Sequence, residues 1–266
     1  MPSLTLPAAR ASRARALRSI TALMLREIGA SNGRSALGYL WEVVEPVAYI
    51  LLLSFLFGLF LSAPPLGTSF PLFYASGILP FLMFLEVTNR VAGAVRFSRP
   101  LLTYPGVTFL DAILARFLVA ALTKVAVFAM VLVLLVVFWR VEPFLDVPRL
   151  IEGVLATLLL ALSIGTMNCL LLAFFPLYDR IWALVTKPLL VISAVLYIFD
   201  TVPLPYRDWL WWNPVVHLVG MVRGGIYPTY HGDYVSEVYL AVLVGLTLPP
   251  ALFFLRRYWR ELLEVA

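Results

Sequence analysis

Six apolar stretches, each long enough to cross a lipid bilayer, constrain this chain more than any other feature. The hydrocarbon core of a membrane is about 30 Å thick, which takes roughly 20 apolar residues in a helix. With 62% apolar and 13% charged residues, a chain of 266 residues could not hide this surface in a water-soluble core. A β-barrel is disfavoured because the apolar runs are continuous rather than alternating. We therefore predict an all-α integral membrane protein with six transmembrane helices, at about residues 43–62, 70–92, 111–138, 150–175, 182–199 and 236–255.

The basic residues are distributed unevenly around these predicted spans. Most of the 20 Lys and Arg residues fall before the first span, between spans two and three, between spans four and five, or after the last span. The opposite side would carry only Arg140, Arg149, Arg207 and Arg223, while Lys124 lies within a span. Because cytoplasmic loops are enriched in Lys and Arg, the pattern predicts that both termini are cytoplasmic.

The segment 200–234 fits neither a simple loop nor a simple span. Its middle is apolar but contains Asn213, Pro214, His217 and Arg223. A seventh crossing there would also place the arginines that follow the last span outside the cell. We predict a re-entrant helical hairpin that enters the membrane from the external side, packed in protein or facing a water-filled cavity. A folded external loop with Trp residues at the interface is the alternative.

The segment 12–36, before the first span, has the pattern of an amphipathic helix. Leu17, Ile20, Met24 and Ile28 recur at steps of three and four residues, while the arginines fall elsewhere. Such a helix would lie along the inner leaflet as an interface helix.

The sequence gives no sign of a nucleotide, metal or cofactor site. Both lysines, Lys124 and Lys187, follow Thr, so the chain has no Gly-Lys dipeptide and no P-loop. His217 and His231 lack His or Cys neighbours at metal-ligand spacing. We therefore expect no cofactor, no metal and no catalytic residue. A membrane acyl- or glycosyltransferase that uses one His or one carboxylate remains an alternative.

A basic approach leads directly into the first predicted span. Arg26-Glu27 is followed by Leu-Gly-Tyr-Leu-Trp at 37–41, and Glu45-Pro46 then opens the apolar run. This order resembles the entry to the first span in permease subunits of ATP-binding-cassette exporters that move polysaccharides. Generic spans rarely carry this combination.

The loop between spans two and three, residues 93–110, carries a second motif. Val107, Leu110, Asp111 and Arg116 match the Val-x-x-Leu-Asp-x-x-x-x-Arg pattern that opens the third span in the same exporters. In those permeases a short cytoplasmic helix precedes the motif, so the resemblance implies an ATPase-coupling loop. A short helix that is both basic and apolar also suits a groove on a soluble protein. The alternative is an ordinary cytoplasmic loop.

The third motif lies before the last span. Asn213-Pro214 followed by His217 and Arg223 is similar to the re-entrant segment of these exporters, but Gly220 stands where an acidic residue is often found. This departure argues against an acid–base pair at that place. Together the three motifs make the chain resemble capsular polysaccharide export permeases of the KpsM type.

The resemblance implies a function and a set of partners. A permease of this family, with a single transmembrane domain over 1–266, is not itself an enzyme. It would form a homodimer with separate ATP-binding-cassette ATPase subunits. The complex would move a lipid-linked anionic capsular polysaccharide across the inner membrane, in contact with membrane lipids and with periplasmic and outer-membrane export proteins; no nucleic acid is expected. The alternatives are an O-antigen or teichoic-acid exporter, a drug-efflux permease and a membrane-embedded transferase.

Cations within the spans are candidates for substrate entry. A charged side chain inside a membrane costs free energy unless it pairs with an opposite charge or has a function. Arg90, Arg116 and Lys124 could receive an anionic headgroup near the inner leaflet. Glu86 and Arg90 are one helical turn apart and could instead pair with each other. Arg116 could equally reach lipid headgroups, and Lys124 could find a partner within the dimer or line the path.

Aromatic side chains at the two ends are candidates to line a sugar path, although Trp and Tyr gather at membrane interfaces in any protein. At the external end, Arg223 could bond free carbonyls at the helix break or contact the polymer, and we favour the structural role. The predicted substrate-binding residues are Arg90, Arg116, Lys124, Tyr39, Trp41, Trp211, Trp212 and Arg223, and the predicted ATPase-coupling residues are Arg96, Arg99, Leu101 and Tyr104.

Overall fold

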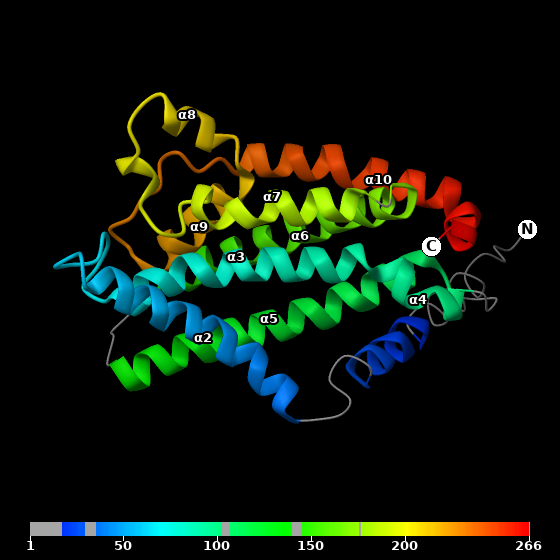
Figure 1. Ribbon diagram of the computed structural model, residues 1–266, viewed down its shortest axis with the longest axis horizontal. Helices are drawn as coiled ribbons and strands as arrows, with labels where there is room; N and C mark the ends of the chain where they lie inside the picture. The colour runs from blue at the N-terminus through cyan, green and yellow to red at the C-terminus, as the bar shows by residue number, and fades with distance from the viewer. Residues whose placement is uncertain (1–17, 30–35, 103–106, 140–144, 176, 266) are drawn as a thin grey trace, which may run out of the picture.

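The chain folds into an elongated bundle of helices whose axes run roughly in one direction (Figure 1). The computed structural model describes residues 18–29, 36–102, 107–139, 145–175 and 177–265, and every regular element within these ranges is a helix. The helices are α1 (18–29), α2 (Ala36–Gly58), α3 (Phe70–Ala92), α4 (Ala94–Leu102), α5 (Phe109–Trp139), α6 (Val147–Phe174), α7 (Tyr178–Ile192), the 3₁₀ turn η1 (Phe199–Thr201), α8 (Tyr206–Trp211), α9 (Pro214–Ile226) and α10 (Glu237–Val265). Five of them, α2, α3, α5, α6 and α10, are long and apolar enough to cross a membrane.

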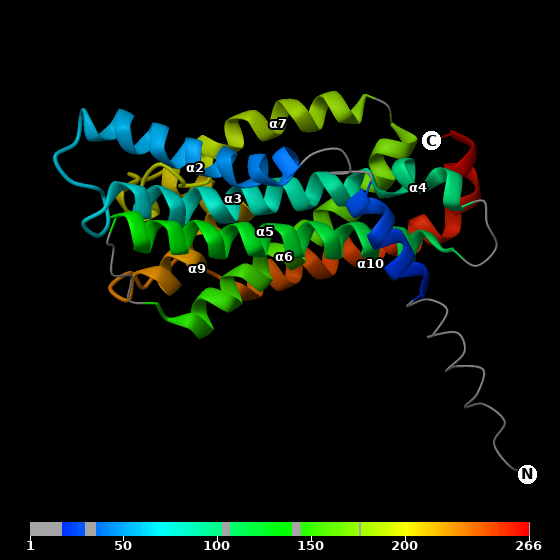
Figure 2. The same cartoon turned by 90° about the horizontal axis from the view of Figure 1, so that it is seen from below.

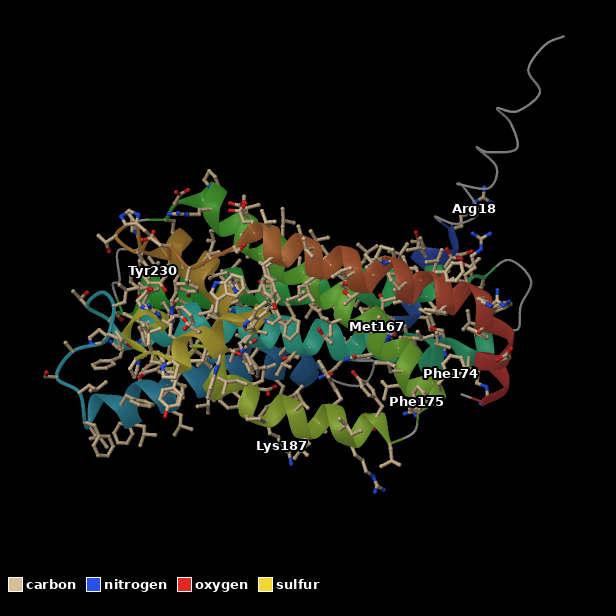
Figure 3. All side chains as sticks on the ribbon, turned by 90° about the horizontal axis from the view of Figure 1, so that it is seen from above. Arg18, Met167, Phe174, Phe175, Lys187 and Tyr230 are labelled. Carbon is tan, nitrogen blue, oxygen red and sulfur yellow. The ribbon has the colours of Figure 1, made fainter. Side chains whose placement is uncertain are left out.

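The two ends of the bundle differ in composition. One end carries α1, α4 and the end of α10, and the other carries α8, α9 and the connection 59–69 (Figures 1 and 2). Figure 3 shows Arg18, Phe174 and Phe175 at the first end and Tyr230 at the second. We call them the basic end and the aromatic end.

Helix α3 forms the centre of the bundle, and α6 packs closely against it. Within its most apolar 18-residue window, 72% of α3 is buried, against 11% for α2. Gly165 of α6 permits the close approach: a Cβ there would lie 2.7 Å from the Val91 Cβ and 2.9 Å from the Thr88 carbonyl oxygen. Small residues at such crossings allow helix backbones to pack tightly in membranes. The two helices therefore give the bundle its rigid core.

Helix α9 is short but completely enclosed. Every residue from Val215 to Ile226 is buried, and the helix packs between α6 and α3. Gly225 lies so close to α6 that a Cβ would be 2.7 Å from the Leu150 Cα. Helix α8 precedes it and ends at Trp211. The interpretation of this pair as a re-entrant hairpin stays a prediction.

The predicted fifth span, 182–199, is not a continuous helix. Helix α7 has 15 residues and ends at Ile192, which gives about 22 Å at 1.5 Å per residue. The chain then turns through Ala194, which has a positive φ of 55°. Lys187, which was predicted to flank the short loop before this span, lies within α7 and points away from the bundle (Figure 3). Among the described residues, helix length and composition therefore give five candidate spans rather than the predicted six.

Candidate translocation and coupling site

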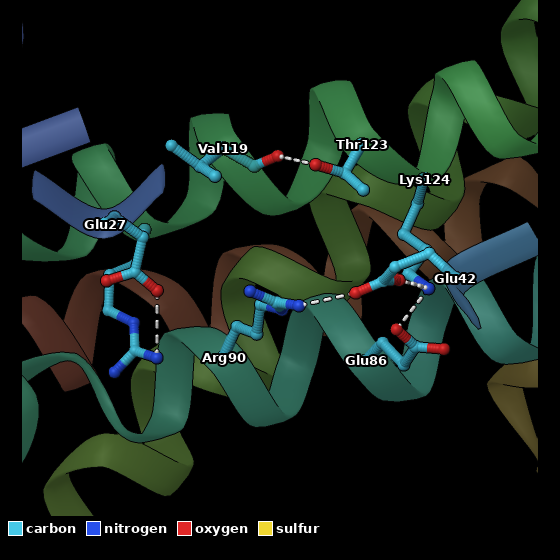
Figure 4. A network of polar contacts seen from close by, with 8 residues as sticks. Glu27, Glu42, Glu86, Arg90, Val119, Thr123 and Lys124 are labelled. Carbon is cyan, nitrogen blue, oxygen red and sulfur yellow. Dashed lines mark hydrogen bonds and ion pairs between the residues drawn. The ribbon is translucent and has the colours of Figure 1, made fainter. Parts of the chain in front are cut away.

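Four charged side chains join helices α2, α3 and α5 (Figure 4). Glu42 of α2 accepts a hydrogen bond from the Arg90 Nη2 at 2.8 Å through its Oε1, and its Oε2 contacts the Lys124 Nζ. Lys124 also pairs with Glu86 of α3. The Lys124 side chain is only 6% exposed, so the two carboxylates compensate a charge that would be costly to bury alone. We call Glu42, Glu86, Arg90 and Lys124 the charge cluster.

Arg116 of α5 connects three further elements at the basic end. Its Nη2 pairs with a Glu27 oxygen of α1 at 3.1 Å, and its Nη1 donates to the Gly93 carbonyl at 2.9 Å. Its guanidinium carbon lies 4.4 Å from the centre of the Phe97 ring on α4, and that of Arg26 lies 5.1 Å from the same ring. Two cation–π contacts thus link α4 to α1 and to α5, and the ion pair links α1 to α5.

The structure gives each predicted entry cation a carboxylate partner within the same chain. Arg90 bonds Glu42 on another helix rather than Glu86 one turn away on its own. Lys124 finds both of its partners inside the monomer. The sequence interpretation missed Glu27 and Glu42 as partners. For Glu42, the signal that could have found it is a carboxylate near the start of an apolar helix, which needs a cation nearby.

Helix α4 lies where the resemblance implies contact with an ATPase. It is amphipathic, with Val95 buried, Arg99 half-buried and Arg96 exposed. The Leu101 side chain and Tyr104, both predicted coupling residues, lie outside the described part of the chain. The exposed surface of α4 is basic, which suits a docking surface.

The Asp111 motif caps helix α5. The Thr108 amide donates to the Asp111 Oδ2 at 2.9 Å, and the Asp111 amide donates to the Thr108 Oγ1 at 3.2 Å. This reciprocal pair is a capping box, and the Thr-x-x-Asp spacing could have revealed it in the sequence. Asp111 therefore has a structural role at the end of the predicted coupling loop. A hollow of about 300 Å³ beside it is lined by Val107, Thr108, Phe109, Arg256 and Trp259.

At the aromatic end, Arg223 of α9 is fully buried and bonds main-chain oxygens. Its Nη1 donates to the Tyr197 carbonyl at 2.8 Å and its Nη2 to the Val195 carbonyl at 2.9 Å. The guanidinium carbon also lies 4.5 Å from the centre of the Phe73 ring. These carbonyls belong to the non-helical chain after α7, so Arg223 replaces the helix hydrogen bonds that this segment lacks. The sequence interpretation expected Arg223 to bond free carbonyls at the Asn213-Pro214 break. The carbonyls that it bonds lie instead in the turn after α7.

Asn213 and His217 tie the same segment to its neighbours. Asn213 Oδ1 caps α9 by accepting from the Val215 amide at 3.0 Å, while its Nδ2 donates to the Ile192 carbonyl at 3.0 Å. His217 is fully buried, with its Nε2 2.8 Å from the Trp211 carbonyl and its Nδ1 accepting from the Ser236 amide at 3.1 Å. The Asn-Pro and His elements of the motif thus hold the end of α7, α8 and the start of α10 together.

Gly220 leaves no room for the acidic residue that the family pattern often carries. A Cβ at this position would lie 2.6 Å from the Tyr234 hydroxyl oxygen and 2.7 Å from the Val235 Cγ2. Burial raises the pKa of Tyr230 and of Tyr234, whose hydroxyls bond each other at 3.1 Å. Protonated tyrosines, rather than a carboxylate, therefore occupy this place beside α9.

The predicted aromatic residues divide into packed and exposed ones. Trp211 is half-buried, donates to the Tyr234 carbonyl at 2.9 Å and contacts other rings. Trp212 and Trp41 are 67% and 66% exposed. The side chain of Tyr39 lies outside the described part of the chain. Among the described candidates, Trp41 and Trp212 therefore expose most of their surface to a sugar ring, although the Trp212 ring also contacts Trp211 and Tyr239 edge-on.

The described residues contain no obvious catalytic or metal centre. No group of three or more His, Cys, Asp and Glu side chains within the described ranges is placed to hold a metal ion. Residues 29–33 read Gly-Ala-Ser-Asn-Gly, the G-x-S-x-G pattern of serine hydrolases. That pattern indicates a nucleophile on a strand-to-helix turn; Gly29 is the last residue of helix α1, and residues 30–33 lie outside the described part of the chain.

Comparison with known proteins defines the class. The ABC-2 type transporter family profile matches residues 18–227, and the chain belongs to this family. It is 34% identical over 233 residues to the polysialic acid transport protein KpsM of Escherichia coli, covering 86% of this chain and 89% of that protein. It is 27% identical to the capsule polysaccharide export inner-membrane protein CtrC of Neisseria meningitidis serogroup A, covering 82% and 81%. Identity to the corresponding protein BexB of Haemophilus influenzae is 28%, with the same coverage.

Proposed function

We propose that this chain is the transmembrane subunit of an exporter that moves a lipid-linked, anionic capsular polysaccharide across the inner membrane. Separate ATP-binding-cassette subunits would supply the energy. The observation that carries the proposal is the match over 86% of the chain to a polysialic acid transport protein. The names of the other relatives also favour capsule over O-antigen or teichoic acid.

Six crossings and cytoplasmic termini follow if α7 and the turn after it together form the fifth crossing. In support, α7 runs along the bundle from the basic end toward the aromatic end (Figure 2). Helices α1 and α4 and the end of α10 share the basic end, which suits the cytoplasmic side because of its arginines. Helices α8 and α9 would then enter the membrane from outside.

A second copy of the chain is the partner expected on the face formed by α2 and α7. These helices lie on either side of α3 and stand out on one side of the bundle (Figures 1 and 2). Helix α7 has no buried residue, and only 11% of the α2 window is buried within the monomer. Two facing copies would enclose a path between them, with Trp41 toward the cytoplasm and Trp212 toward the periplasm. Periplasmic and outer-membrane export proteins would receive the polymer beyond this exit.

Helix α4 would transmit the action of the ATPase. Its exposed basic side, which includes Arg96, would dock on the ATPase, while Phe97 faces Arg116 and Arg26. Because Arg116 also pairs with Glu27 and bonds Gly93, a displacement of α4 would also shift α1, α3 and α5. The charge cluster lies farther along α3 and α5, where Arg90 and Lys124 would meet the anionic lipid head.

Co-purification in mild detergent tests the proposal. We expect an ATP-binding-cassette subunit to purify with the chain. Arg99→Glu should reduce the recovery of that subunit at least several-fold, because it reverses a charge on helix α4. Arg180→Glu, at an exposed position at the start of α7, is the matched control and should retain the ATPase. Purification without any ATPase, or equal recovery with Arg99→Glu, would contradict the proposal.

A further inference from the structure

Helix α2 is loosely packed against the rest of the bundle, with only 11% of its most apolar window buried. Of its described side chains only Pro46 and Ile50 are buried. Partly buried side chains such as Val47 and Phe57 also pack against the core. The polar attachment of the helix is Glu42, whose two carboxylate oxygens contact Arg90 on α3 and Lys124 on α5. Glu42 therefore fastens the cytoplasmic half of a loosely packed helix to the rigid part of the bundle.

The charge cluster is already neutral, which restricts how it can bind an anion. Two cations face two carboxylates, so an added phosphate would bring unbalanced negative charge into a largely buried place. One carboxylate must leave if a phosphate is to bind. Glu86 belongs to the well-packed α3, like Arg90, whereas Glu42 belongs to α2 and can move with it.

The space beside the cluster leads to the same conclusion. A crevice lined by Pro46, Leu82, Glu86 and Lys124, among others, has a volume of about 10 Å³. This is roughly the room for one water molecule and too little for a phosphate group. A phosphate can reach Lys124 only if α2 moves away from α3 and α5.

We propose that Arg90 and Lys124 form a latent site for the phosphate of a lipid headgroup, and that the phosphate binds by taking the place of the Glu42 carboxylate and releasing α2. The inference rests on the proposed function, because it concerns how a lipid-linked substrate enters. A phosphate offers oxygens in the same forked arrangement as a carboxylate, so it can accept from both donors. Arg116 is not part of this site, since Glu27, Gly93 and Phe97 occupy it.

Cross-linking between α2 and α3 tests the exchange directly. Cysteines at Pro46 and Leu82, which line the same crevice, would be introduced into the full chain with Cys169→Ser and joined by a short thiol cross-linker. The chain would be placed in nanodiscs of phosphatidylcholine with or without phosphatidic acid, whose headgroup is a bare phosphate. We expect efficient cross-linking in phosphatidylcholine and a several-fold decrease with phosphatidic acid.

Two variants of α2 test whether the Glu42 contact itself, rather than any negative charge on α2, holds the helix in place. Glu42→Gln should cross-link poorly in both lipid mixtures, because the helix is already released. Glu45→Gln, which removes the same charge from the same helix, should behave like the parent chain. Equal cross-linking of parent and Glu42→Gln in phosphatidylcholine, or no effect of phosphatidic acid on the parent, would overturn the inference. Because no readout depends on ATP hydrolysis or export, such a failure would leave the proposed function to be judged by co-purification.

Discussion

The two ends of the molecule neutralise their buried cations in different ways. At the basic end, Arg90, Lys124 and Arg116 each pair with a carboxylate from another helix. At the aromatic end, Arg223 is fully buried and bonds the carbonyls of Val195 and Tyr197. Among the residues that the structure describes, no carboxylate pairs with it.

This difference separates a site that can exchange partners from one that cannot. A carboxylate on a mobile helix can be replaced by another anion of similar shape. The carbonyls that Arg223 satisfies are part of the chain itself, and an unsatisfied carbonyl within a membrane costs several kcal/mol. We therefore expect the charge cluster to serve substrate entry and Arg223 to serve the fold.

The largest effect is expected from Arg223→Met. It leaves two main-chain carbonyls without donors, at roughly 1–3 kcal/mol each, and removes the contact with Phe73, for a total of about 5 kcal/mol. We expect most of the protein to be lost or aggregated, as measured by size-exclusion chromatography in detergent after expression.

Arg223→Lys is the informative control for that experiment. A lysine keeps the charge but cannot reach two carbonyls with a planar fork, so it should also be destabilised, though less than the Met variant. If both variants fold normally and only export is impaired, Arg223 would contact the polymer, and the contrast between the two ends would fail.

Lys124→Met should have the next largest effect. It removes the cation between Glu42 and Glu86 and leaves a carboxylate uncompensated, at about 3 kcal/mol. The thermal unfolding temperature in detergent should fall accordingly. Adding Glu86→Gln should restore much of the loss, because the leftover charge is removed. Equal destabilisation of the single and double variants would mean that packing rather than charge holds this site.

The sequence predicted the long helices well, because an apolar stretch in a membrane must satisfy its own backbone. The predicted span 70–92 coincides with α3, and 111–138 differs from α5 by two residues at one end and one at the other. The predicted fifth span, 182–199, is not one continuous helix, for a specific reason. The apolar composition continues to residue 199. However, Asn213 bonds the carbonyl of Ile192, the last residue of α7, and Arg223 bonds carbonyls of the turn that follows, so the helix can end early.

The site was less predictable because its partners are far apart in the sequence. Glu42 is 82 positions from Lys124 and 48 from Arg90. No local pattern links such positions, so the cations were predicted to be important without their carboxylates. Asp111 was easier to predict. Its partner Thr108 is three residues away, so the Thr-x-x-Asp spacing in the sequence is enough to indicate its capping role.

Gly220→Ala sharpens the picture of the aromatic end with a moderate effect. The new Cβ would press against the Tyr234 hydroxyl and Val235, at a cost of about 2 kcal/mol for overpacking. Tyr234→Phe in the same chain removes the hydroxyl and should return part of the lost thermal stability. An unfolding temperature that Gly220→Ala does not change would show that α9 can shift, which would not fit the fixed hydrogen bonds of Arg223 on the same helix.

The smallest effect on stability is expected from Trp212→Ala, which tests whether the aromatic end has any contact with the polymer. Trp212 is 67% exposed, so its removal should change the free energy of unfolding by less than about 0.5 kcal/mol. Trp211→Ala is the matched comparison, because Trp211 donates to the Tyr234 carbonyl and packs against His217 and Tyr239. If Trp212 lines the exit, its variant should fold normally and export less polysaccharide, as measured by surface capsule against protein in the membrane. Normal export by Trp212→Ala would leave the aromatic end with a purely structural role and place all substrate contacts elsewhere.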